Sequence, residues 1–274
     1  QQAKAKALSA WERARPATTD HPNLARKQVQ PHGPRVNAAG TLLVPIYHFS
    51  DSGGFELWAV QEILGNGTFS HRGDKRFPLG SMKKGGFFSL GETGGDTQLY
   101  FCEGFATGAS IHEATGKPII CCFDAGNLEP VISQWRVLHP GREFVICGDD
   151  DQYGAQNAGR DKAEAAAKNH NCLGVFPKFT ALDTEPTDFN DLHCQEGLQA
   201  VKEQLEKTNT SPNPDLSPEA CRVSAQLTSR PPERPMLMTL EGVGVLPAGI
   251  VAMGGATGGT GKTFLLLNLS FCWL

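Results

Sequence analysis

The chain has 274 residues, enough for one large domain or two of ordinary size. Hydrophobic residues make up 39% and charged residues 20%, a balance that supports a buried core and excludes a wholly disordered chain. No apolar run reaches the ~18 residues that a membrane-spanning helix needs, so we expect no membrane role. The formal net charge of −4 argues against nucleic-acid binding through bulk positive charge, although a local basic cluster can still bind it.

The eight cysteines show neither a CxxC pair nor zinc-finger spacing. Cys102, Cys121, Cys122 and Cys147 lie inside apolar, strand-like runs, where thiols behave as small hydrophobic groups. We therefore expect reduced core cysteines in a cytoplasmic protein. The chain begins at Gln1 and ends within an apolar run, so we expect a fragment of a longer protein.

The first 95 residues predict a small α+β subdomain. Residues 3–15 form an amphipathic pattern typical of a helix, and residues 21–27 predict a second helical turn. Strand-like runs follow at 41–49, 55–63 and 87–90, separated by glycine-rich turns. Basic residues cluster late in this part, and from their charges alone we expect a solvated turn; they are Arg72, Lys75, Arg76, Lys83 and Lys84.

Residues 96–206 alternate between strand and helix. Apolar strand patterns lie at 98–102, 118–123, 143–147 and 174–176. Helical patterns lie at 106–115, 128–137, 160–169 and 196–206, and Gly116 is placed to end the first of them. Continuously apolar strands that alternate with helices predict a parallel sheet covered on both faces.

The remaining residues divide into a linker and a new segment. Residues 207–236 are rich in Pro, Ser, Thr and Asn and lack an apolar period, as is typical of a linker. Residues 237–274 contain an apolar strand pattern at 249–253, a glycine-rich loop and the start of an apolar helix.

Acidic residues follow three successive predicted strands. Glu103 follows the first strand, Asp124 the second, and the triplet of residues 149–151 the third. Because ligand sites in open parallel sheets lie at the carboxyl ends of the strands, we expect these acids at one edge. Asp149 and Asp151 are two residues apart, so an extended chain points both the same way and Asp150 elsewhere. Oxygen ligands of this kind suit Mg²⁺ or Mn²⁺, whereas the alternative for any single Asp is a helix cap or an Asx turn.

The order of these acids resembles that of the Toprim domain of primases and topoisomerases. The runs LYFCEGFATGASIHEATGKPIICCFDAGNLEPV (99–131), VICGDDDQYGAQNAGRDKAEAAA (145–167) and PTDFNDLHCQEG (186–197) resemble the Toprim segment of plasmid and phage primases and primase-helicases. Upstream, HPNLARKQV (21–29) and DKRFPLGSMKKGGFFSLGE (74–92) resemble the N-terminal half of the same catalytic core. The resemblance covers about residues 20–206 and implies a DNA primase, which synthesises short RNA primers on a DNA template.

The resemblance also implies roles for individual residues. Glu103, Asp149 and Asp151 match the metal-binding catalytic positions, and Asp124 is expected as an outer contributor to the metal site. The residues that match nucleotide- and template-binding positions are Lys75, Arg76, Lys83 and Lys84, and Lys162 is either a phosphate ligand or an exposed helix residue. A late motif contains Asp188, Asn190 and Asp191, where the alternative role for Asp188 is a helix N-cap.

A second motif lies near the end of the chain. Residues 256–263, ATGGTGKT, fit the Walker A pattern with Ala256 in place of the first glycine. The expected ATP-binding residues are Gly258, Gly259, Thr260, Gly261, Lys262 and Thr263, with the backbone and Lys262 on phosphates and Thr263 on Mg²⁺. The segment resembles the start of a RecA-like helicase ATPase. The chain ends eleven residues after Thr263 without a Walker B acid, so we expect ATP binding only in the full-length parent.

Together these patterns predict an α/β protein. We expect a primase N-terminal subdomain (1–95), a Toprim-type parallel sheet with flanking helices (96–206), a linker (207–236) and an incomplete P-loop segment (237–274). The expected partners are single-stranded DNA template, nucleoside triphosphates and other replication proteins. Two alternatives stay open: a Toprim-type metal-dependent nuclease, and a non-catalytic module that positions a helicase on DNA.

Overall fold

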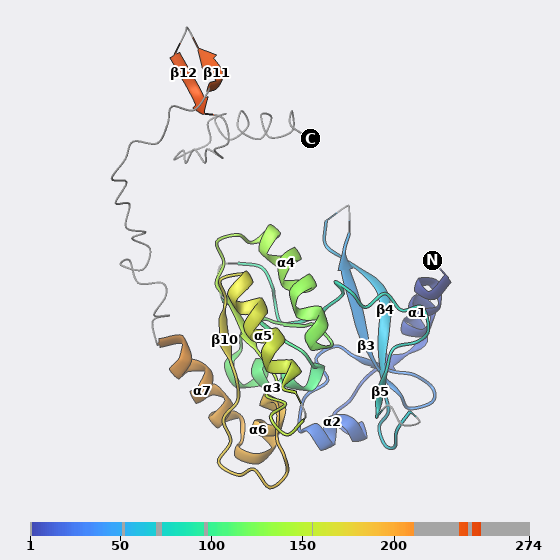
Figure 1. Ribbon diagram of the computed structural model, residues 1–274. Helices are drawn as coiled ribbons and strands as arrows, with labels where there is room; N and C mark the ends of the chain where they lie inside the picture. The colour runs from blue at the N-terminus through green and yellow to red at the C-terminus, as the bar shows by residue number, and fades with distance from the viewer. Residues whose placement is uncertain are drawn as a thin grey trace. The chain divides into compact units, whose positions relative to one another are not determined.

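The N-terminal part of the chain folds around an antiparallel sheet (Figure 1). This computed structural model describes residues 2–50, 53–69, 73–95, 98–154, 156–210, 236–240 and 243–247. The order of the first sheet is β1-β2-β3-β4-β5, and helix α1 contacts β4. Its elements are α1 (Gln2–Arg13), β1 (Arg15–Pro16), α2 (Pro22–Lys27), β2 (Arg35–Val36), β3 (Leu42–Phe49), β4 (Phe55–Ile63) and β5 (Lys75–Arg76).

The following residues build a second five-stranded sheet, in the order β10-β9-β7-β8-β6. Strands β10, β9, β7 and β8 run parallel, whereas β6 pairs antiparallel with β8 at the edge. The strands are β6 (Phe88–Leu90), β7 (Leu99–Cys102), β8 (Ile119–Cys121), β9 (Phe144–Cys147) and β10 (Leu173–Val175). The helices are α3 (Phe105–Thr115), α4 (Leu128–Leu138), α5 (Ala158–Asn169), α6 (Phe189–Glu196) and α7 (Leu198–Thr210), and a short 3₁₀ turn, η1 (Ala125–Asn127), precedes α4.

Both faces of the second sheet are buried, as the apolar strand runs predict. Tyr100 and Cys102 of β7 join one core with α3, α6, α7 and the first sheet. Leu99 and Phe101, the alternate residues of β7, join the other core with α4 and α5. The two-residue period of a strand thus sends its side chains into two separate cores, and that double burial holds the strand ends in fixed positions.

Several element boundaries differ from the sequence-based prediction. Helix α1 ends at Arg13, before residue 15, because Pro16 disfavours helical backbone at the residue before it. The expected helix 196–206 is preceded by α6, and Gly197 separates α6 from α7 with a φ of 85°. The expected parallel sheet is extended at one edge by β6 from the N-terminal part, which pairs antiparallel with β8 and which the sequence analysis assigned to the first subdomain.

Residues 1–214 and 215–274 form two compact units. In the second unit, β11 (Met236–Leu240) and β12 (Val243–Pro247) form an antiparallel hairpin that the sequence analysis did not predict. The expected strand at 249–253 and all of the expected P-loop residues lie outside the described residues. None of the helices that the structure describes is both long enough and apolar enough to cross a membrane.

Candidate active site

The strand order places Glu103 between the other two acidic strand ends. Strand β7 lies between β9 and β8, and Cys102 pairs in register with both Cys147 and Cys121. Glu103 therefore follows β7 at the level where Gly148 follows β9, with Asp149 one residue further on. Three acids that are far apart in the sequence meet at one carboxyl edge, as the strand pattern predicts.

Glu103 is held in an environment that disfavours its ionised form. Within the described part of the chain, its Oε1 atom is buried and has no hydrogen-bond partner. Burial, followed by the negative charges of Asp151 and Asp124, raises the pKa of Glu103 to about 7. The Ala125 backbone N–H and the Lys162 ammonium oppose that rise only in part. At neutral pH this carboxyl group is therefore poised between its two protonation states.

Asp149 shares this environment. Its Oδ1 atom is also buried, and no group in the described ranges forms a hydrogen bond with it. Burial, and then the charges of Glu103, Asp188 and Asp151, raise the pKa of Asp149 well above its ordinary value. Two neighbouring carboxyl groups with raised pKa values and unpartnered oxygens form a site that a cation would stabilise.

The side chain of Asp151, in the acidic loop beside Asp149, lies against the first turn of helix α5. A Cβ atom added to Gly159 would lie 2.8 Å from Asp151 Oδ2 and 3.1 Å from the Asp149 carbonyl oxygen. Because glycine has no side chain, the first turn of α5 approaches the acidic loop closely without a clash. Gly159 thus has a steric role that sequence spacing alone does not reveal.

Asp150 points away from the other acids, as the alternation of the triplet predicts. Its carboxylate accepts hydrogen bonds from Asn157 Nδ2 at 2.6 Å and from Arg160 Nη1 at 3.0 Å. The Asn157 side chain in turn caps α5 by accepting from the Arg160 backbone N–H. Asp150 therefore fixes the loop to the start of α5 and takes no part in the acidic cluster.

Asp124 forms an ion pair with Lys83 from the N-terminal part. The residue before it, Phe123, has a φ of 73°, which is uncommon for a bulky residue and turns the chain sharply out of β8. The Phe123 ring contacts Phe77, and the Lys83 ammonium lies 5.2 Å from the centre of the Phe77 ring. Asp124, the expected outer contributor to the metal site, is therefore also the counter-ion of Lys83.

The other expected basic residues divide between pairing and exposure. Arg76 donates to Glu62 at 2.6 Å and lies over the Phe69 ring, and its side chain stays 52% exposed. Lys75 is exposed, and its charge favours ionisation of Asp149. Lys84 is exposed as well. Lys162 on α5 is also exposed, and its charge favours ionisation of Glu103. Lys75 and Lys162 thus face the acidic edge from two different elements.

The late acidic motif is mainly structural. Asp188 caps α6 by accepting from the Asp191 backbone N–H at 2.8 Å, as the alternative reading predicts. It also accepts from the Thr107 hydroxyl at 2.9 Å and adds negative charge near Asp149. Asn190 is fully buried and donates to the Lys27 carbonyl at 2.8 Å, so it fixes α6 to the end of α2.

The acids at this edge fit a metal ion by their chemistry, although their side chains do not surround one common point. Among the residues that the structure describes, no three His, Cys, Asp or Glu side chains form a ready-made cluster around one point. Glu103 and Asp149 nevertheless offer buried, unpartnered oxygens that are the preferred ligands of Mg²⁺ and Mn²⁺. These two acids, with Asp151 beside them, are the residues that would hold the ion.

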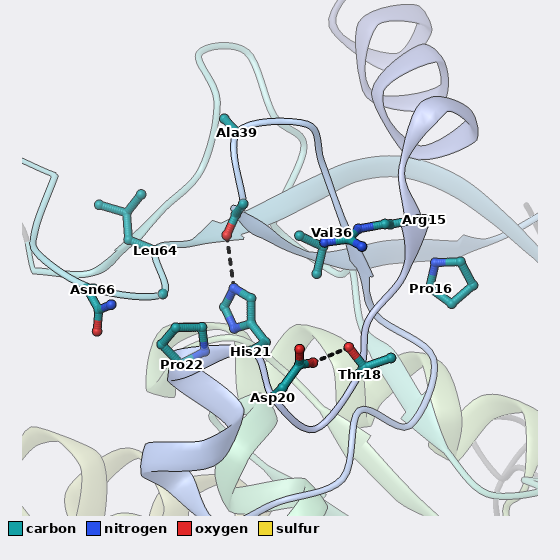
Figure 2. A pocket seen from close by; sticks show the side chains of 12 residues that line it. Arg15, Pro16, Thr18, Asp20, His21, Pro22, Val36, Ala39, Leu64 and Asn66 are labelled. Atoms are coloured by element: carbon teal, nitrogen blue, oxygen red, sulfur yellow. Dashed lines mark hydrogen bonds between the residues drawn. The ribbon is translucent and has the colours of Figure 1, made fainter.

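A separate pocket of about 370 Å³ lies in the N-terminal part (Figure 2). It is lined by residues that include Arg15, Asp20 and His21, and none of the expected site residues lines it. His21 contacts the Gly40 carbonyl oxygen at 3.0 Å through Nε2, and Thr18 donates to Asp20. Because the pocket lacks the acidic edge, the candidate site is located by its chemistry and not by the size of a cavity.

The comparisons with known proteins agree with this location. Residues 98–199 match the model of the Toprim domain family. We call these residues the Toprim segment, and they contain Glu103, Asp124 and Asp149. The family resemblance drawn from the sequence is therefore confirmed for this segment.

Two curated relatives are each named DNA primase TraC and come from Escherichia coli. One is 37% identical over an alignment of 139 residues that covers 48% of this chain and 9% of the relative. The other is 32% identical over an alignment of 218 residues that covers 72% of this chain and 20% of the relative. The chain thus spans a fifth or less of the length of these two relatives.

Solved structures of primases are also similar. The RNA polymerase domain of Mycobacterium tuberculosis primase DnaG is 16% identical with a TM-score of 0.42, covering 64% of this chain and 59% of that one. A chain in the structure of bacteriophage T7 lagging-strand DNA polymerase interacting with primase domains is 14% identical with a TM-score of 0.47. That similarity covers 67% of this chain and 89% of that one.

Proposed function

We propose that this chain carries the primer-synthesising site of a DNA primase. The observation that carries the proposal is the pair formed by Glu103 and Asp149 on the adjacent strands β7 and β9. Both carboxyl groups have a buried oxygen without a partner in the described ranges, and burial and like charge raise both pKa values. The Toprim match over residues 98–199 and the two relatives named DNA primase support the same reading.

Glu103, Asp149 and Asp151 would hold Mg²⁺ or Mn²⁺. A bound divalent ion supplies activation of a primer 3′-hydroxyl and stabilisation of a pyrophosphate leaving group. The chain's own contribution is positional: two rigid strand ends hold the acids, and Gly159 lets α5 close beside them. Exposed Lys162 lies near this edge and would neutralise the triphosphate of an incoming nucleotide. The two basic pairs, Lys75-Arg76 and Lys83-Lys84, would contact nucleotide and template phosphates.

Further parts of the proposal concern the whole protein. Single-stranded DNA template, nucleoside triphosphates and other replication proteins would be its partners, and the free cysteines fit a cytoplasmic location. The Walker A pattern at 256–263 supports an ATP-binding, RecA-like helicase portion in a longer parent. A plasmid or phage primase-helicase combines these features.

The deciding experiment is primer synthesis on a single-stranded template with nucleoside triphosphates and Mg²⁺. We expect short RNA products from the wild-type chain and at least a hundredfold less from Glu103→Gln or Asp149→Asn, with Ser133→Ala on α4 as a control that keeps activity. Cleavage of the template without synthesis would favour the Toprim nuclease. DNA binding without either reaction would favour the non-catalytic module.

A further inference from the structure

An apolar side chain stands fully in solvent on the segment that carries the basic residues. Leu79 is 101% exposed, and Met82 is 45% exposed three residues later. Leu79 lies at the tip of a β-turn in which the Ser81 N–H donates to the Pro78 carbonyl at 3.0 Å, and Gly80 has a φ of 83°. A glycine with positive φ at this position is typical of a type II turn, which presents the preceding side chain outward. We call residues 78–81 the Leu79 turn.

The Leu79 turn is anchored on both sides. Gly80 lies against helix α1, since a Cβ atom on it would be 3.2 Å from the Ala3 methyl group. On the other side, a His48 ring nitrogen from β3 lies 3.0 Å from the Met82 carbonyl oxygen. The exposure of Leu79 is therefore set by a held backbone and not by a loose loop.

Asn127 holds residues 83–86, which follow the Leu79 turn in the chain. Its amide group donates to the carbonyl oxygens of Lys83 at 3.2 Å and Gly86 at 2.8 Å, and accepts from the Gly85 N–H at 2.7 Å. Because Asn127 is the last residue of η1, the turn after β8, it connects the basic segment to the strand end that carries Asp124. A ligand that binds a segment held in this way loses little affinity to ordering of the protein.

Exposed lysines lie on both sides of Leu79 in the sequence. Lys75 precedes Leu79 by four residues and Lys84 follows it by five, and both are exposed. Among the described residues neither lysine has an ion-pair partner, whereas Lys83 is paired with Asp124. A segment that carries an exposed apolar side chain and exposed cations complements a single-stranded nucleic acid, which offers phosphates beside unpaired bases with apolar faces.

We infer that the Leu79 turn is a template-binding element in which Leu79 contacts an unpaired base of single-stranded DNA while Lys75 and Lys84 contact its phosphates. The inference rests on the proposed function for the identity of the strand. It assigns to Leu79 a contact that depends on the presence of a base and not on charge.

The test is binding of a fluorescein-labelled oligothymidylate, measured by fluorescence anisotropy without nucleotides, so that no synthesis is needed. A second oligonucleotide of equal length carries abasic sites throughout and keeps the phosphates. The variant is Leu79→Ser, which changes a side chain that makes no core contact. The matched control is Leu182→Ser, since Leu182 is 52% exposed, lies in a turn with Glu185 and stands beside Asp183.

We expect Leu79→Ser to bind oligothymidylate about three- to tenfold more weakly, as loss of a partly buried aliphatic contact would give. Its salt dependence should equal that of the wild type because no charge is removed. Both proteins should bind the abasic strand equally, and Leu182→Ser should match the wild type on both strands.

Equal binding of oligothymidylate by Leu79→Ser and wild type would overturn the inference. An equal loss on the abasic strand would overturn it as well, because that loss would not depend on a base. If Leu79→Ser instead changed the sedimentation of the protein and not its DNA affinity, the turn would contact a second copy. Primer synthesis measured on the same samples separates the two proposals. If the wild type synthesises primers but Leu79→Ser binds oligothymidylate as the wild type does, only the inference about Leu79 is wrong and the proposed function stands.

Discussion

Lys83 and Asp124 form an ion pair that joins the N-terminal basic segment to the carboxyl end of strand β8. The pair brings a cation next to the acids that would hold a metal ion, and Asp124 is one of the charges that raise the pKa of Glu103. The geometry of the acidic edge therefore depends on a residue outside the Toprim segment.

Removing Lys83 should affect the acidic edge through Asp124. In Lys83→Met, the Asp124 charge loses its counter-ion and should raise the pKa of Glu103 further, which lowers stability at pH 8. We expect a loss below about 1 kcal/mol, since both partners are more than a third exposed. Thermal unfolding of Lys83→Met with Asp124→Asn should recover wild-type stability. A double variant as unstable as the single one would show that Lys83 acts by packing on Phe77 and not by charge.

The stability of the chain without metal should fall between pH 4.5 and pH 7. The pKa of Glu103 is about 7 in the folded chain against an ordinary value of 4.5, so the folded state retains a proton that the unfolded state releases. The stabilisation is complete below pH 4.5 and is lost as pH rises to 7. The loss from this group is at most about 3 kcal/mol.

Glu103→Gln checks this pH dependence, because an amide does not titrate. Thermal unfolding of the variant should vary less between pH 5 and pH 8 than that of the wild type, and it should exceed the wild type at pH 8. Mg²⁺ at pH 8 should raise the melting temperature of the wild type and not that of the variant. A parallel pH profile for both proteins would contradict the assigned environment of Glu103.

Asp150 should separate structure from chemistry within the acidic triplet. Asp150→Ala removes the bonds to Asn157 and Arg160 and should cost about 1 kcal/mol, because the pair is partly exposed. The melting temperature should fall by about 2–4 °C. Primer synthesis should persist below that temperature, whereas Asp149→Asn should lose synthesis and keep or gain stability. Loss of synthesis in fully folded Asp150→Ala would place Asp150 among the acting acids.

Lys84 should contribute to DNA binding through charge alone. Lys84→Ala should weaken binding of single-stranded DNA and lower the slope of log affinity against log salt by about 0.7, the value for one phosphate contact on a single strand. Lys168→Ala, which removes an exposed lysine near the far end of α5, is the matched control and should leave the slope unchanged. The measurement is a salt titration of anisotropy, and an unchanged slope for Lys84→Ala would return this lysine to the solvated surface.

Lys262 should be needed only for ATP-dependent steps of a full-length parent. Lys262→Ala should abolish ATP-driven unwinding there and spare primer synthesis, because a long linker sequence separates the Walker A pattern from residues 96–206. In the 274-residue chain the same change should have no measurable effect on synthesis. Loss of priming on an unpaired template would show that the two nucleotide sites are coupled.

The sequence by itself determined the parallel strands of the second sheet and the acids at its edge. Continuous apolar runs predict buried parallel strands, and an acid directly after a strand can only emerge at the carboxyl end. Glu103 and Asp149 could therefore be placed together before any coordinates, and the alternation within the triplet correctly separated Asp150 from its neighbours. These features are local in the chain, so residue patterns are enough to reveal them.

Only the tertiary structure decided how the N-terminal part meets this edge. The pairing of β6 with β8, the contact of Lys83 with Asp124 and the three bonds of Asn127 join segments about 30 to 45 residues apart, and no periodicity records such contacts. The same holds for Leu79, which reads as one more apolar residue in a basic stretch. Its full exposure follows from a turn that α1 and β3 hold from outside, because burial depends on what packs against a side chain and not on its type.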